Sequence, residues 1–160
     1  HRVAQNAQTL IAAAESLTLG NMLRYAANGA AAQRGFAALK TETLRKPGSQ
    51  FRFWGTMQQL DGFVQFEISG AASMHIMEMQ VTPARQGFGL GARMMEHMLR
   101  HARTFGMEEV TLVCNAANTR ALGFYTQHQG FVAIARFEDA HWRAPQIELA
   151  HLGHASPAEG

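Results

Sequence analysis

The segment "VTPARQGFGLGARMMEHML", residues 81–99, constrains the fold more than any other part of the chain. Its glycine-rich stretch, Gln86–Gly91, joins a segment with strand-like alternation to one with helical periodicity. A loop in that place leaves the first amides of the helix without backbone partners, and the helix dipole adds positive potential there. The segment therefore predicts either an anion-binding loop, whose glycines let a phosphate approach the main chain, or a simple tight connection.

Three segments before this loop have the period of two that is typical of β-strands. They are Gln50–Gln59, Phe63–Ser69 and Met74–Val81, and the short turns between them predict antiparallel pairing. Residues 1–46 are rich in Ala, Leu and Gln and predict two or three short helices. Residues 2–4 are a weak candidate for an additional strand.

The segments after the loop predict a β-loop-α-β unit. Residues 91–105 have helical periodicity, with a predicted buried stripe formed by Met94, Met95, Met98, Leu99, Ala102 and Phe105. Residues 110–115 are almost wholly apolar, as expected of a buried parallel strand. A second helix is predicted over 118–128, and segments 131–138 and 145–152 predict a final pair of antiparallel strands.

Composition limits the classes of function. The 160 residues carry a net charge of +2, and the ten acids of residues 61–160 outnumber their seven arginines, so we expect no nucleic-acid partner. No apolar run is long enough to span a membrane. Cys114, the only cysteine, excludes an internal disulfide and a cysteine zinc cluster and favours a cytoplasmic or nuclear location. An upstream targeting segment stays open because the sequence begins at His1.

Three kinds of phosphate-binding loop compete for the glycine segment. A P-loop requires Gly-Lys-Ser/Thr, and no lysine follows Gly91. The dinucleotide pattern Gly-x-Gly-x-x-Ala is met by Gly87, Gly89 and Ala92, but it requires an acid near the end of the next strand. Glu108 and Glu109 instead precede that strand, which disfavours dinucleotide binding.

The third pattern, Q/R-x-x-G-x-G/A, matches Gln86–Gly91. Together with "VTP" before the loop, the helix and apolar strand after it, and "NTRALGFYTQHQGF" (Asn118–Phe131), it resembles the GNAT superfamily of N-acetyltransferases over Phe51 to about Leu149. The resemblance implies an α/β fold of the α+β type, with a mixed, mostly antiparallel sheet, a central splayed parallel strand pair and flanking helices. We expect one domain over 1–160, in which 50–150 bind acetyl-CoA.

The resemblance also implies the chemistry and the residues that bind the co-substrate. Acetyl would pass from acetyl-CoA directly to an amine acceptor in a ternary complex, without a metal. Loop amides would hold the pyrophosphate, and backbone groups of the preceding strand would pair with the pantetheine arm. The implied co-substrate-binding residues are Met79, Val81, Gln86, Gly87, Phe88, Gly89, Leu90, Gly91 and Asn118. Asn118 is also a good helix N-cap, which is the structural alternative for this residue.

Two side chains are candidates for proton transfer. Tyr125 lies where many GNAT enzymes have a tyrosine as general acid for the leaving thiolate; the alternative is a packing role. Simple alternation places Glu78 on one strand face with Ile76 and Gln80, and His75, Met77, Met79 and Val81 on the other. A carboxylate in a central strand is costly unless it is paired or useful. Glu78 is therefore either a general base or ammonium-binding group, or the partner of a nearby arginine.

The acceptor is predicted by a finer resemblance. The run "MEMQVTPARQGFGLG" is similar to the strand and loop of NatD-type protein N-terminal acetyltransferases, which predicts the N-terminal amine of a protein or peptide. His75 and Trp142 are the candidate substrate residues, although Trp142 could equally be an exposed turn aromatic. Two alternatives stay open: a small-molecule amine acetyltransferase, and an acyl-CoA-binding module without turnover. The oligomeric state is not predicted.

Overall fold

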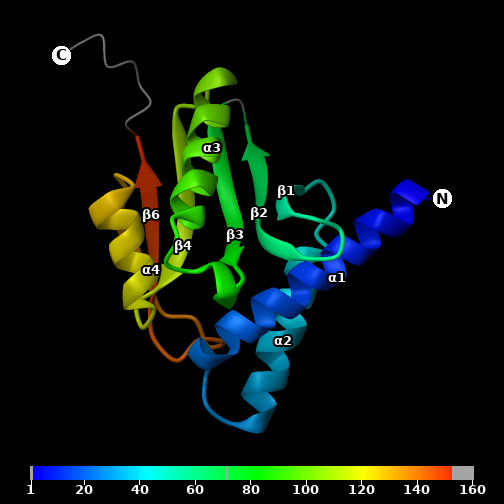
Figure 1. Ribbon diagram of the computed structural model, residues 1–160. Helices are drawn as coiled ribbons and strands as arrows, with labels where there is room; N and C mark the ends of the chain where they lie inside the picture. The colour runs from blue at the N-terminus through cyan, green and yellow to red at the C-terminus, as the bar shows by residue number, and fades with distance from the viewer. Residues whose placement is uncertain (1, 71, 153–160) are drawn as a thin grey trace.

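The computed structural model describes residues 2–70 and 72–152 (Figure 1). The helices are α1 (Arg2–Met22), α2 (Ala30–Leu44), α3 (Leu90–Thr104) and α4 (Thr119–Gly123), with short turns η1 (Leu23–Tyr25), η2 (Pro83–Arg85) and the π-helical η3 (Phe124–His128). The strands are β1 (Gln50–Gly55), β2 (Leu60–Ser69), β3 (Ser73–Val81), β4 (Glu109–Asn115), β5 (Val132–Phe137) and β6 (Gln146–His151). The strand candidate at residues 2–4 is wrong, because these residues belong to α1. No helix in the described ranges is both long and apolar enough to cross a membrane.

The strands form one mixed sheet in the order β1-β2-β3-β4-β6-β5. Every neighbouring pair is antiparallel except the central pair, β3 and β4. Their parallel pairing is limited to Ser73–Ile76 against Glu109–Leu112, so the carboxyl-terminal parts of both strands have no common register. The predicted α/β fold with a splayed central strand pair is therefore confirmed.

A β-bulge in β3 reverses the direction in which its side chains point. Gln65 of β2 pairs with Glu78, but the next residue, Phe66, pairs with Ile76, so Met77 is the extra residue. An extra residue moves all following side chains to the opposite face.

The two sides of this bulge differ from the predicted alternation. Ile76 lies in the main core, and beyond the bulge Met79 and Val81 pack against that same core. Glu78 and Gln80 instead contact side chains of α2 and α1. The prediction that Ile76 shares a face with Glu78 is wrong, because alternation was assumed to continue through Met77.

Helices cover the two faces of the sheet and form its core. On one face, α3 buries Leu90, Met94, Met95, Met98 and Ala102, and Figure 1 shows it lying along the central strands. Helices α1 and α2 pack against each other, and α1 also contacts β2 and β3. Phe105 is wrong as a member of the buried stripe: α3 ends at Thr104, and the ring is 62% exposed, 4.6 Å from that of His101.

Candidate functional site

The divergence of β3 and β4 opens a cleft of about 810 Å³ in the middle of the sheet. Its floor is formed by Ile76–Val81 of β3 and Leu112–Asn115 of β4. The loop before α3 closes one end, while α4 and η3 form one wall and the end of α1 with η1 forms another. Strands that separate in this way leave main-chain groups unpaired, and a ligand can use them.

The loop before α3 presents a row of free amides. The Gln86 N–H donates to the Pro83 carbonyl (3.3 Å), and the Arg93 N–H donates to the Gly89 carbonyl (3.1 Å). In the described part of the chain, the amides of residues 87–92 have no backbone acceptor at hydrogen-bond distance and angle. The predicted set of free amides was residues 86–91, and the observed set is shifted by one residue. The Gln86 amide is bonded within the loop, and the Ala92 amide is free.

At two of the three glycine positions in this loop, the backbone conformation requires glycine. Gly87 and Gly89 both have a φ of +85°, which L-residues with a Cβ rarely adopt. Left-handed residues between right-handed ones turn successive N–H groups to one side and form an anion-binding concavity. Gly91 is helical, and a Cβ there would lie 3.7 Å from the Phe124 ring, an ordinary contact.

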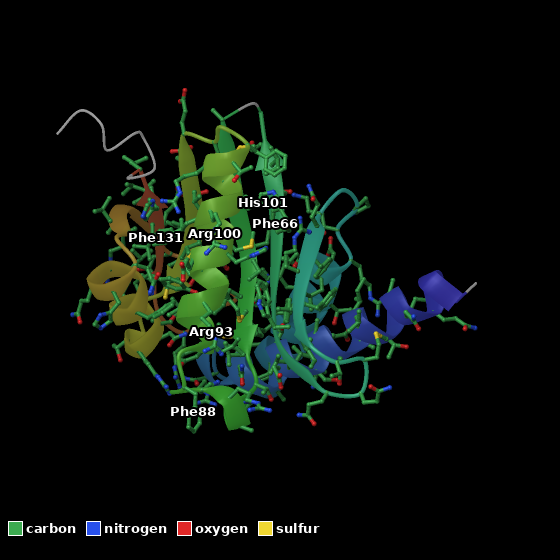
Figure 2. All side chains as sticks on the ribbon, turned by 45° about the horizontal axis from the view of Figure 1, so that its top comes forward. Phe66, Phe88, Arg93, Arg100, His101 and Phe131 are labelled. Atoms are coloured by element: carbon green, nitrogen blue, oxygen red, sulfur yellow. The ribbon has the colours of Figure 1, made fainter. Side chains whose placement is uncertain are left out.

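The side chains of the predicted loop residues lie in different places. Phe88 is 76% exposed, and Figure 2 shows its ring directed away from the protein. Leu90 is buried in the core. Neither side chain lines the cleft, so Phe88 and Leu90 can contribute through their amides alone. Arg120 of α4, which the sequence did not single out, extends toward the loop: a Cβ at Gly87 would lie 3.9 Å from its guanidinium.

The backbone of β3 faces the cleft at two residues. The Thr82 N–H donates to the carbonyl of Asp61 in β2, so by alternation Met79 and Val81 direct their backbone groups to the opposite side, toward β4. The Val81 carbonyl accepts hydrogen bonds from Asn21 Nδ2 and Gln86 Nε2, both at 3.0 Å. Met79 therefore has both backbone groups available, whereas Val81 keeps only its N–H.

Tyr125 lies in the cleft wall within the π-helical turn η3. Its ring packs edge-on against Phe124 and Phe131, with centroids 5.3 and 5.8 Å away. The hydroxyl forms no hydrogen bond with any residue in the described ranges. Burial raises the pKa of Tyr125 well above its usual value of 10, and Cys114 and Glu78 raise it further. The phenol is thus protonated at neutral pH and available as a donor.

Glu78 belongs to a buried polar chain. Its Oε2 accepts a hydrogen bond from Lys40 Nζ at 2.8 Å, and its Oε1 accepts one from Gln80 Nε2 at 2.7 Å. Asn21 Nδ2 then donates to Gln80 Oε1 at 3.0 Å. The Glu78 and Lys40 side chains are only 5% and 11% exposed. Sequence reasoning expected an arginine as the alternative partner and missed Lys40, which is 38 residues away in the chain.

The two candidate substrate residues have different positions. Trp142 lines the cleft, where its ring lies 4.8 Å from that of Phe36 and 4.9 Å from Lys40 Nζ. His75 does not line the cleft; its Nδ1 lies 2.8 Å from Thr111 Oγ1. Burial lowers the pKa of His75. The prediction that His75 contacts substrate does not agree with this geometry, because His75 precedes the point where the strands separate.

Two further cleft residues have structural contacts. Asn118 caps α4, and its Oδ1 accepts a hydrogen bond from the Ala121 amide (3.3 Å), which leaves its Nδ2 for a ligand. Burial raises the pKa of Cys114 to about 11, so the thiol stays protonated and is a poor nucleophile. Among the described residues, no cluster of His, Cys, Asp and Glu could hold a metal ion.

A loop of free amides, a gap between two parallel strands and a protonated tyrosine beside it are together typical of proteins that bind a phosphate-containing ligand. Residues 20–131, more than half of the chain, match the model of the acetyltransferase (GNAT) family. The chain belongs to this family, whose members transfer acetyl from acetyl-CoA to an amine.

Solved structures share this fold. A ribosomal-protein alanine N-acetyltransferase from Escherichia coli is 17% identical, with a TM-score of 0.63 over 92% of this chain and 91% of that chain. A GNAT acetyltransferase from Elizabethkingia anophelis with acetyl-CoA bound is 13% identical, with a TM-score of 0.58 over 66% and 76%. A spermidine N-acetyltransferase from Vibrio cholerae is 16% identical, with a TM-score of 0.56 over 75% of both chains. At these identities the likeness concerns the fold alone.

Proposed function

We propose that this protein transfers the acetyl group of acetyl-CoA to the N-terminal amine of a peptide or protein. The observation that carries the transferase part is the cleft between β3 and β4. It joins free loop amides at one end to Tyr125, Glu78 and Lys40 further along. The free amides of residues 87–92 would hold the pyrophosphate, and the backbone of Met79 would pair with the pantetheine arm.

The residues of the cleft support direct transfer. The amine nitrogen attacks the thioester carbonyl, so that a C–N bond forms and the C–S bond breaks. The amine must lose a proton, and Glu78 is the carboxylate that lines the cleft to accept it. The leaving thiolate gains a proton from the hydroxyl of Tyr125, which no described residue engages. Each Glu78 oxygen has a second lone pair beyond its bonds to Lys40 and Gln80.

The peptide acceptor is supported by two independent features. The strand and loop 77–91 are similar to those of NatD-type N-terminal acetyltransferases. In addition, the Escherichia coli structure that aligns with 92% of this chain is by name an enzyme acting on an alanine of a ribosomal protein. A small-amine acceptor is the second candidate, because a spermidine acetyltransferase also shares the fold.

The test is acetyl-CoA turnover, measured as released CoA thiol, on peptides with free N-termini and on small amines. We expect turnover on peptides, and loss of most of it in Glu78→Gln, which keeps an acceptor oxygen for Lys40. N-acetylated peptides with the same sequences are the control and should be inactive. Turnover confined to spermidine or similar amines would contradict the peptide acceptor and support a small-amine acceptor instead. Tight acetyl-CoA binding with no turnover would leave a binding module.

A further inference from the structure

The charged side chains that line the cleft are mostly cationic. Among the described lining residues they are Arg24, Lys40, Arg85 and Arg120, against the single carboxylate of Glu78. Arg120 extends toward Gly87, and Arg85 follows β3 and lies 3.4 Å from Asp61, so both belong to the phosphate end. A bound pyrophosphate would account for positive charge there. It would not account for the two cations of α2 and η1.

The carboxylate of Glu78 already has a cationic partner within the protein. Both of its oxygens accept hydrogen bonds, and one of the donors is the ammonium group of Lys40 at 2.8 Å. Lys40 is held from its other side by the rings of Phe36 and Trp142, at 5.7 and 4.9 Å. Among its described lining residues, the cleft therefore offers no unpaired carboxylate to a second positive charge on a substrate. An acceptor rich in cations is disfavoured.

Arg24 is the cation of this region that has no charged partner. It forms no ion pair with any described residue, and its guanidinium lies 5.9 Å from the centroid of the Tyr25 ring. The turn that carries Arg24 is fixed to the segment around Trp142: the Arg143 N–H donates to the Tyr25 carbonyl and the Ala27 N–H to the His141 carbonyl, both at 3.0 Å. Arg24 thus lines the same cleft as Trp142 and Lys40, on a turn that is held to the segment around Trp142.

We propose that Arg24 binds an anionic group that the acceptor carries close to its reactive amine. This inference deepens the proposed function and rests on it. The shared chemistry is a primary amine next to a carboxylate, supplied either by a peptide with Asp or Glu in its second position or by a free amino acid. A guanidinium pairs with carboxylates through two parallel hydrogen bonds, which gives geometric selection as well as charge selection.

The experiment compares acceptors that differ only in this charge. Peptides with Glu in the second position are paired with the same peptides carrying Gln, and free amino acids with their α-carboxamides. We expect kcat/KM to be about tenfold higher for the anionic member of the preferred pair. The preference should shrink between low and high salt, because Arg24 is exposed to solvent. The peptide and amino-acid arms identify the source of the carboxylate.

The variants test whether Arg24 is the cause. Arg24→Gln should reduce the anionic preference to near one, mainly through KM, and Arg24→Glu should reverse it. Arg34→Gln is the matched control, because Arg34 is an exposed arginine of α2 that does not line the cleft. Equal kcat/KM within every wild-type pair would overturn the proposal, as would a preference that survives in Arg24→Gln.

Two further measurements separate the possible failures. If Arg24→Gln instead abolishes the discrimination between acetyl-CoA and its 3′-dephospho form, Arg24 binds the co-substrate and the proposal is wrong. If no amine is acetylated, the proposed function fails, and binding then tests Arg24 by itself. Calorimetry in the presence of CoA should show the anionic member of the preferred pair, an N-acetylated peptide with Glu rather than Gln in its second position or an N-acetyl amino acid rather than its α-carboxamide, binding about tenfold more tightly to the wild type, and equal binding within each pair to Arg24→Gln. Equal binding to the wild type would overturn the inference.

Discussion

The two ends of the cleft differ in the groups that form them. The phosphate end consists of main-chain amides from one continuous loop, residues 87–92, in which Gly87 and Gly89 set the direction. The acceptor end consists of side chains from separate elements, joined by contacts such as Lys40–Glu78 and Asn21–Gln80 that span 38 and 59 residues. The comparison teaches that one end depends on local dihedral angles, whereas the other depends on how α1 and α2 dock against β3.

The largest expected effect concerns the acceptor end. Glu78→Ala leaves the buried ammonium of Lys40 without its partner, which should lower the free energy of unfolding by about 3–5 kcal/mol. Urea denaturation measures this change. The double variant Glu78→Ala with Lys40→Met should lose less than the single variant, since it removes both charges. A loss below about 1 kcal/mol in the single variant would contradict a buried ion pair.

The second prediction separates chemistry from binding. Tyr125→Phe removes a hydroxyl that no described residue engages, so we expect little change in thermal stability or acetyl-CoA affinity. The rate kcat should fall about 100-fold, the lower end of what general acid catalysis contributes. Turnover at saturating substrates, beside a thermal melt, measures both. An unchanged kcat would assign Tyr125 a packing role.

The third prediction concerns the phosphate end. Gly89→Ala introduces a Cβ at a φ of +85°, which should cost about 1–2 kcal/mol of stability and weaken acetyl-CoA binding about tenfold, because the loop amides shift. Gly48→Ala is the matched control: its φ is +81°, and it does not line the cleft. It should lose similar stability and keep its affinity. Equal losses of affinity in both variants would show that the effect is not local.

The smallest expected effect concerns His75, outside the cleft. Because burial lowers its pKa, the unfolded chain binds more protons than the folded one below about pH 6.5. The contribution of neutral His75 to the free energy of unfolding is therefore fully present above that pH, and it is lost as the pH falls toward the folded-state pKa. His75→Asn should weaken this dependence in denaturation experiments at pH 5 and 7.5 and leave turnover unchanged. A large loss of turnover would return His75 to the acceptor site.

The predicted and observed sites differ where contacts are long-range. The loop glycines and Glu78 were singled out from local sequence and Tyr125 from the resemblance to the GNAT superfamily, and Trp142 was left between two alternatives. Lys40 and Arg24 were missed, since no spacing in α2 or η1 distinguishes them from ordinary surface cations. The orientation of Glu78 was predicted on the wrong assumption of unbroken alternation, because no residue type near Met77 signals the bulge.

The sequence by itself determined most of the elements, their order and the glycine-rich loop before α3, because periodicity, turn residues and left-handed glycines act over a few neighbouring residues. The tertiary structure alone decided which face Glu78 occupies, that Lys40 pairs with it, and that Arg24 lines the same cleft. These outcomes depend on the bulge at Met77, on the contact of α1 with β3, and on the Lys40–Glu78 pair that joins α2 to β3. Contacts of that kind join residues far apart in the chain, so no local pattern encodes them.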